Sequence, residues 1–231
     1  MCSFLVLTRV GLTGGIAAGK SAVAELWRER GAVVIDADEL ARRALTPGTP
    51  TYFAVVQTFG PGIVKPDGAI NRAALGEMVF GNEEHRRRLN ELVHPVVRQK
   101  RQETIAALQQ GAAVAVEVIP LLFEVGEENE FDCIVTVACS EATQLARLAA
   151  KGFSESQARA RIAAQWPMAR KMERADYVIW NDGSRRVLAE QADIVWRNIQ
   201  ESYHAPKQNQ QKKQDADHSK NSQGTSPHGH P

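Results

Sequence analysis

The chain has 231 residues, of which 43% are hydrophobic and 24% are charged, and its formal net charge at pH 7 is +1. This length suits one sizeable α/β domain with a small insertion, and the near-neutral charge excludes a general electrostatic attraction to nucleic acid or membrane. No apolar run approaches the roughly 18 residues of a membrane span, and the three cysteines have no metal-binding or redox spacing. We therefore expect a cytoplasmic protein, a monomer or weak homo-oligomer, with no nucleic-acid or membrane partner.

Short apolar runs alternate with helical patterns along most of the chain. After the first run, residues 20–30 place their apolar side chains on one helical face, and Gly31 ends this helix. Buried strands that are separated by helices predict a parallel sheet covered by helices on both faces. The strands are expected at residues 4–11, 32–36, 112–119, 132–139 and 177–180.

Two helical stretches interrupt this alternation. Residues 39–111 have almost no strand character and are too long for one crossover, so we expect a helical insertion over the working edge of the sheet. Residues 141–173 predict a pair of helices around the sequence K-G-F-S, with Ser154 and Gln157 forming a capping box at the second helix.

The remaining segments divide into a core and a tail. Residues 1–38 and 112–204 carry the predicted strands and are expected to form the core. Residues 205–231 contain no large apolar residue, and such a segment cannot bury enough surface to offset its ordering entropy. We expect a disordered polar tail there.

The sequence V-G-L-T-G-G-I-A-A-G-K-S at residues 10–21 matches a phosphate-binding loop. Gly14, Gly19, Lys20 and Ser21 satisfy the pattern G-x-x-x-x-G-K-[ST] between a predicted strand and a predicted helix. In such a loop, backbone N–H groups surround the phosphates of a nucleoside triphosphate, the lysine reaches the β and γ oxygens, and the serine hydroxyl ligates Mg²⁺. The residues expected to contact the nucleotide in this loop are Gly14, Gly15, Ile16, Ala17, Ala18, Gly19, Lys20, Ser21 and Ala22.

Other motifs favour a small kinase among the proteins that use such a loop. A guanine-nucleotide switch would need D-x-x-G and N-K-x-D, and neither occurs in the chain. A kinase needs a carboxylate near the acceptor hydroxyl and a segment that closes to exclude water. Asp36 and Asp38, at the carboxyl end of the second predicted strand, are the candidates, with capping of the following helix as the alternative for either one. A nucleotide-binding regulatory protein without catalysis is a second class of function.

Four segments together resemble the dephospho-coenzyme A kinase family: G-L-T-G-G-I-x-x-G-K-S, V-I-D-A-D-x-L-A-R, L-N-x-L-V-H-P and I-P-L-L-F-E, in this order and spacing. The resemblance covers residues 5–203. It implies an α/β P-loop NTPase fold with a five-stranded parallel sheet flanked by helices, a helical coenzyme A-binding domain at 39–111 and a helical lid at about 141–173. It also implies Mg²⁺-dependent transfer of the γ-phosphate of ATP to the ribose 3′-hydroxyl of dephospho-coenzyme A, the last step of coenzyme A biosynthesis. A P-loop kinase for another nucleotide or nucleoside acceptor is the alternative.

The resemblance also implies roles for residues at matching positions. Asp38 corresponds to the general base, and Lys20 and Arg147 correspond to cations that stabilise charge on the transferred phosphoryl group. Asn181 would border the adenine of ATP, and Ser21 would ligate Mg²⁺. The residues implied for the acceptor side are Asp38, His94, Leu121, Leu122, Glu124 and Arg161.

The chain departs from the usual pattern of this family at several positions. Ala17 and Ala18 stand where glycine and serine are usual, and alanine at position 17 is unstrained if its φ is negative. Val118 stands where an acid is frequent, with Glu117 one residue earlier, so a part for Glu117 around Mg²⁺ stays open. Lys151 stands where the lid often carries arginine, and lysine lacks the bidentate guanidinium fork.

Overall fold

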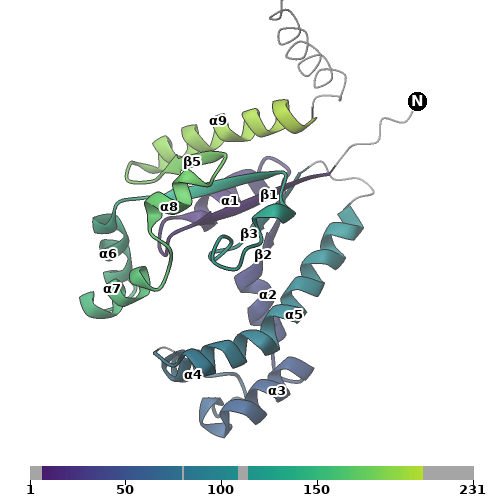
Figure 1. The fold of residues 1–231 in the computed structure, drawn as a ribbon, viewed down its shortest axis with the longest axis vertical. Coiled ribbons are helices and arrows are strands. Elements are labelled where there is room, and N and C mark those ends of the chain that lie inside the picture. Colours follow the sequence, from purple (N-terminus) through teal and green to yellow (C-terminus); the bar gives the residue numbers. More distant parts are fainter. Residues whose placement is uncertain (1–6, 80, 109–113, 205–231) are drawn as a thin grey trace, which may run out of the picture.

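The computed structural model describes residues 7–79, 81–108 and 114–204 of the chain. The polar tail predicted at 205–231 lies outside these residues, so its predicted disorder is not addressed by the structure. Figure 1 shows a central sheet with a long helical segment on one side and a second, shorter helical segment on another.

The centre of the fold is a five-stranded parallel sheet with the strand order β2-β3-β1-β4-β5. The strands are β1 (Thr8–Gly14), β2 (Val33–Asp36), β3 (Val114–Val118), β4 (Cys133–Ala138) and β5 (Tyr177–Trp180). The predicted α/β fold with a parallel sheet is confirmed. The first strand ends at Gly14 and not at Gly11, because Leu12, Thr13 and Gly14 continue the pairing with β4.

Helices follow most of the strands and fill the two stretches that interrupt the alternation. The first helix ends at Arg28, two residues earlier than expected, and the chain then turns at Gly31 with φ +92°. The helices are α1 (Lys20–Arg28), α2 (Ala37–Ala44), α3 (Pro50–Phe59), α4 (Arg72–Val79), α5 (Glu83–Leu108), α6 (Glu141–Ala149), α7 (Glu155–Ala163), α8 (Met168–Glu173) and α9 (Arg185–His204). Within the described ranges, no helix combines the length and the apolar character that a membrane span requires.

One face of the sheet packs against α1 and α9. Alternate residues of the central strands, such as Val10, Leu12 and Val116, are buried in one apolar cluster with these helices. Trp27 of α1 and Trp196 of α9 lie with ring centroids 5.8 Å apart in this cluster. The strict alternation along each strand follows from its period of two residues, and it leaves the intervening residues for the other face.

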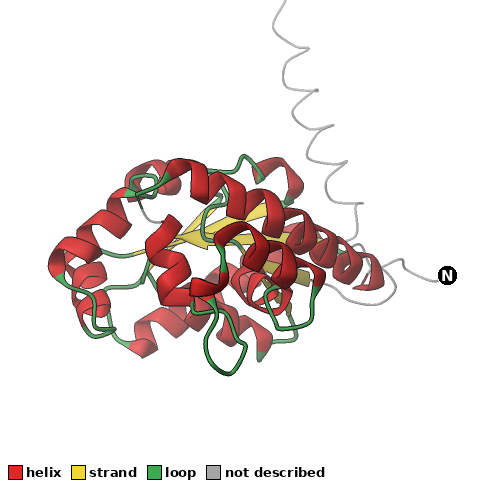
Figure 2. Ribbon diagram, turned by 90° about the horizontal axis from the view of Figure 1, so that it is seen from below, coloured by secondary structure: helices red, strands yellow, loops and turns green. Residues whose placement is uncertain are grey.

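The other face packs against α5, α8 and the connection that follows β3. Ala115 of β3 and Ile105 of α5 share one buried cluster with Ile35. Ile134 of β4 packs with Phe123 of the connection in another. Helices therefore cover both faces, as the apolar runs predicted (Figure 2).

The α2–α5 segment (residues 37–108) has an apolar cluster of its own. Val55, Ile63 and Val93 are among the side chains buried there, between α3, α4 and the first half of α5. The second half of α5 instead packs on the sheet through Ile105. Helix α5, which has 26 residues and is about 39 Å long, therefore connects the segment to the sheet, with α3 and α4 at its far end (Figure 1).

The α6–α8 segment (residues 141–173) contains the expected helical pair and a third short helix. The predicted capping box is confirmed: the Ser154 hydroxyl accepts from the N–H of Gln157, and the Gln157 side chain accepts from the N–H of Ser154. The third helix, α8, begins after Pro167, and a proline disfavours helical backbone in the residue before it. The structure therefore has three helices over this range, one more than predicted.

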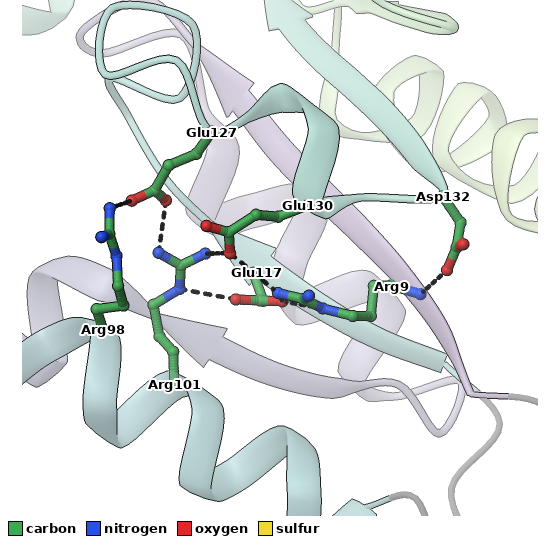
Figure 3. A network of polar contacts seen from close by, with 7 residues as sticks. All are labelled: Arg9, Arg98, Arg101, Glu117, Glu127, Glu130 and Asp132. Atoms are coloured by element: carbon green, nitrogen blue, oxygen red, sulfur yellow. Dashed lines mark hydrogen bonds and ion pairs between the residues drawn. The ribbon is translucent and has the colours of Figure 1, made fainter.

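A buried network of ion pairs joins α5 to the sheet (Figure 3). Glu117 of β3 is fully buried, and its two carboxylate oxygens accept from Arg9 at 2.8 Å and from Arg101 at 2.7 Å. Arg101 also donates to Glu127 at 2.6 Å and lies 3.7 Å from Glu130. Because both oxygens of Glu117 bind arginines, we assign this residue to the α5 contact and not to the surroundings of Mg²⁺.

Candidate active site

The phosphate loop lies between the end of β1 and the start of α1 and is held in a tightly turned conformation. Gly14 has φ +142° and Gly19 has φ +110°. A Cβ on Gly14 would lie 2.0 Å from the carbonyl oxygen of Val137, and one on Gly19 would lie 2.1 Å from Nδ2 of Asn181. Only glycine fits at these two positions, which explains the spacing of the motif.

Ala17 has φ +57° and therefore lies in the left-handed region. The condition under which alanine would be unstrained at this position, a negative φ, is not met. An alanine costs about 1 kcal/mol in this region because its Cβ approaches the following carbonyl oxygen. Other contacts must therefore hold this part of the loop.

Lys20 is a cation with neutral hydrogen-bond partners in the loop. Its Nζ donates to the carbonyl oxygens of Gly14 at 3.0 Å and Gly15 at 2.9 Å. Burial and then the charge of Lys171 lower the pKa of Lys20 to about 8, although the Asp38 and Asp36 carboxylates act in the opposite direction. An anion at this position would restore the ordinary pKa, so Lys20 and the N-terminus of α1 together favour phosphate.

The two aspartates after β2 have different roles. Asp36 is the N-cap of α2, where its Oδ1 accepts from the N–H of Glu39 at 3.1 Å, so the capping alternative is correct for Asp36. Asp38 lies in the first turn of α2 and lines a cavity next to the phosphate loop. Partial burial and then the Asp36 carboxylate raise the pKa of Asp38, while Lys20 opposes this shift. Asp38 therefore remains the candidate general base.

A cavity of about 1040 Å³ extends from the phosphate loop to α5. Its volume is at the upper end for small-molecule sites. It is lined by most of the predicted nucleotide-binding residues, with Gly14, Gly15 and Ala18 as the exceptions, and by several of the predicted acceptor residues. The predicted residues that line it are Ile16, Ala17, Gly19, Lys20, Ser21, Ala22, Asp38, His94, Leu121, Arg147 and Asn181.

Three residues implied for the acceptor side are not among those that line this cavity. Leu122 is fully buried in the apolar cluster that contains Phe123 and Ile134 of β4. Glu124 pairs with Lys171 at 2.7 Å and accepts from the N–H of Trp166. The Arg161 guanidinium lies over the Phe153 ring, 4.5 Å from its centroid. Their substrate contacts remain predictions.

Arg147 of α6 binds the backbone of the phosphate loop. Its Nη1 donates to the carbonyl oxygens of Ala17 at 3.0 Å and Ala18 at 3.1 Å, and its Nη2 donates to that of Asn181 at 2.9 Å. The Asn181 amide in turn donates to the carbonyl oxygen of Ala18 at 2.7 Å. Arg147 and Asn181 thus both bind the carbonyl side of the loop at Ala18, and Arg147 also binds the backbone of Asn181. A contact of Asn181 with adenine remains a prediction.

Sequence reasoning missed two glutamines that bind the same loop. Gln165 accepts from the N–H of Ile16 at 2.8 Å, and Gln144 donates to the carbonyl oxygen of Ile16 at 2.7 Å. Both glutamines lie within residues 5–203, which the family resemblance covers, but no local pattern points to Ile16 as their partner.

The sequence model for dephospho-CoA kinase matches residues 8–186 of the chain. The chain belongs to the dephospho-CoA kinase family. The dephospho-CoA kinase of Geobacillus kaustophilus is 52% identical over 178 residues, which cover 76% of this chain and 89% of that protein. The dephospho-CoA kinase of Anaeromyxobacter dehalogenans is 47% identical over 192 residues, or 82% of this chain and 91% of that protein.

Two solved structures have the same fold. A Thermus thermophilus crystal structure is 34% identical, with a TM-score of 0.73 over 84% of this chain and 98% of that one. The dephospho-CoA kinase of Campylobacter jejuni is 27% identical, with a TM-score of 0.56 over 84% and 97% of the two chains. The family resemblance of the sequence motifs is therefore confirmed across most of the chain.

Proposed function

We propose that the protein transfers the γ-phosphate of ATP to the ribose 3′-hydroxyl of dephospho-coenzyme A, giving coenzyme A and ADP in the last step of coenzyme A biosynthesis. The observation that carries this proposal is a single cavity that Lys20 of the phosphate loop and Asp38 of α2 both line. A phosphate-binding cation and a candidate base in one cavity are what transfer to a hydroxyl requires.

The donor end of the cavity fits ATP and Mg²⁺. Ser21 follows Lys20 at the start of α1 and lines the cavity, so its hydroxyl is accessible as a ligand. Mg²⁺ takes oxygen donors, and the serine hydroxyl of a phosphate loop together with the nucleotide phosphates would supply them. When bound, Mg²⁺ would neutralise charge on the β and γ oxygens.

The acceptor end lies between α2, α5 and the connection after β3. We propose the α2–α5 segment as the acceptor-binding domain, with His94 and Leu121 facing the acceptor. Val93 and Val97 of α5 and Val125 of the connection give this end an apolar wall. Such a wall suits the non-nucleotide part of a large acceptor better than a small polar nucleoside.

In the proposed reaction, Asp38 accepts the proton of the acceptor hydroxyl as its oxygen attacks the γ-phosphorus. Lys20 and Arg147 stabilise the charge that develops on the transferred group. The α6–α8 segment acts as the lid that excludes water, which would otherwise compete with the acceptor. Most of the rate enhancement then comes from positioning and charge neutralisation.

The test is ADP formation by the purified chain with ATP and Mg²⁺, run with and without dephospho-coenzyme A, with coenzyme A identified as the product. We expect ADP to form at a substantial rate only when the acceptor is present. A panel of nucleotides and nucleosides as acceptors discriminates the alternative kinase. The absence of acceptor-dependent ADP formation would favour a regulatory protein. We also propose a cytoplasmic monomer or weak homo-oligomer, which sedimentation at several concentrations would check.

A further inference from the structure

Two glutamines of the α6–α8 segment hold one residue of the phosphate loop from both sides of its backbone. Gln165 accepts from the N–H of Ile16 at 2.8 Å, and Gln144 donates to its carbonyl oxygen at 2.7 Å. Gln144 is buried, with an exposed fraction of 4%. Gly15, the residue before Ile16, also packs closely against this segment. A Cβ on Gly15 would lie 2.6 Å from Nε2 of Gln144 and 2.5 Å from Cε of Met168.

The residue that follows Ile16 is the strained one. Among the described residues, Ala17 is the only residue other than glycine with a positive φ, at +57°. The backbone angles of Ala17 are set by the peptide planes before and after it. Gln144 binds the carbonyl oxygen of Ile16, which belongs to the plane before Ala17. Arg147 binds the carbonyl oxygen of Ala17, which belongs to the plane after it, at 3.0 Å. The left-handed conformation of Ala17 is thus held by side chains of α6.

This conformation matters for phosphate binding. A left-handed residue next to a right-handed one turns successive N–H groups toward one concave side, which forms an anion-binding hollow. An alanine released from its neighbours prefers a negative φ, and that change would rotate the adjoining N–H groups out of the hollow. The hollow therefore depends on contacts from outside the loop.

We propose that Gln144 is a positioning residue that keeps Ala17 left-handed by holding the carbonyl group of Ile16, and that Gln165 assists it indirectly by holding the N–H at the other end of Ile16. Together they keep the phosphate loop in its nucleotide-binding conformation. The inference rests on the proposed binding of ATP by this loop. It adds that side chains of the α6–α8 segment hold the backbone of the phosphate loop in shape.

A double-mutant cycle between Ala17 and each glutamine tests this inference, with the dissociation constant for ATP measured by calorimetry without acceptor. Gln144→Met keeps the bulk of the side chain and removes the donor, and we expect it to weaken ATP binding about five- to tenfold. Gln165→Ala is expected to weaken it about two- to fivefold. In the Ala17→Gly background each loss should fall below about twofold, because glycine adopts a positive φ readily.

Gln157→Met is the matched control, because Gln157 lies in the same segment and caps α7 without contacting the loop. It should leave ATP binding unchanged in both backgrounds. If Gln144→Met no longer folds, as its unfolding temperature would show, Gln165→Ala carries the same cycle because Gln165 is only partly buried.

Equal losses with alanine and glycine at position 17 would overturn the inference. Tighter ATP binding by Gln165→Ala would also overturn it, because Gln165 would then compete with phosphate for the N–H of Ile16. These outcomes are distinct from a failure of the proposed reaction. Coenzyme A formation together with an additive cycle would remove only the inference, whereas a coupled cycle without coenzyme A formation would remove only the reaction.

Discussion

Arg101 is a buried cation and Lys20 is a partly buried one, and their surroundings are opposite. Arg101 belongs to α5 and pairs with the carboxylates of Glu117 and Glu127. Lys20 lies at the carboxyl edge of the sheet and donates to two backbone carbonyl oxygens. A buried charge with charged partners holds segments together, whereas one with neutral partners gains free energy when an anion arrives.

The pKa shifts express the same difference. Burial alone would lower the pKa of Arg101, but the carboxylates of Glu117 and Glu127 outweigh it and raise the pKa overall. Burial, followed by the repulsion from Lys171, lowers the pKa of Lys20 to about 8. Arg101 thus has its charged partners within the protein, whereas Lys20 would gain one when an anion binds in the phosphate loop.

The largest effect should come from removing the candidate base beside the loop. We expect Asp38→Asn to lower kcat about 10²- to 10⁴-fold and to leave the ATP dissociation constant nearly unchanged, because the amide cannot accept the hydroxyl proton. Steady-state kinetics and calorimetry measure the two quantities. Normal turnover by this variant would reassign Asp38 to a structural role.

Breaking the network should cost stability. Arg101→Ala leaves the fully buried Glu117 with one arginine partner fewer, and we expect the free energy of unfolding to fall by about 3–5 kcal/mol, measured by urea denaturation. Arg98→Ala is the matched control, because Arg98 lies on the same helix, is 57% exposed and also pairs with Glu127. Its cost should stay below about 1 kcal/mol. Similar losses in the two variants would show that burial of Arg101 is not what matters.

Arg147 belongs to the loop side of the comparison. We expect Arg147→Ala to lower kcat about a hundredfold, far more than it weakens acceptor binding, because the guanidinium stabilises charge that develops in transfer. The two quantities are measured by kinetics and by acceptor titration. Equal losses in both would contradict a role in the transition state.

The lowered pKa of Lys20 predicts how ATP binding depends on pH. Bound phosphate stabilises the charged lysine, so binding takes up a proton once the free protein has lost it, above its pKa of about 8. We expect the affinity to be highest below this pH and to fall about tenfold from pH 7 to pH 9. Calorimetry in buffers of different ionisation enthalpy measures the proton uptake. A flat profile, as expected for Lys20→Met, would show that Lys20 stays charged throughout.

The smallest effect should come from the start of α7, which belongs neither to the phosphate loop nor to the ion-pair network of Arg101. Ser154→Ala removes one half of the capping box of α7, and we expect a loss of about 1 kcal/mol in unfolding free energy with little change in kcat. Thermal unfolding and steady-state kinetics would check this. A large loss of activity would show that the start of α7 takes part in closure over the site.

Local features could be predicted from the sequence because neighbouring residues decide them. The strands at 33–36 and 177–180 and the capping box at Ser154 follow from residues within a few positions. The phosphate loop is of this kind too, since Gly14 and Gly19 admit no side chain where they lie. The end of β1 was harder to predict, because its last residues adopt strand conformation by pairing with β4.

The sequence by itself thus determined the family, the parallel sheet, the phosphate loop and the pair of aspartates after β2. Only the tertiary structure decided that Asp36 caps α2 while Asp38 lines the cavity, that Glu117 binds arginines, and that Ala17 is left-handed. The physical reason is the distance along the chain between partners. Arg9 and Glu117 are 108 residues apart, and Ile16 and Gln165 are 149 residues apart. The packing of whole segments brings such partners together, and no local sequence pattern specifies that packing.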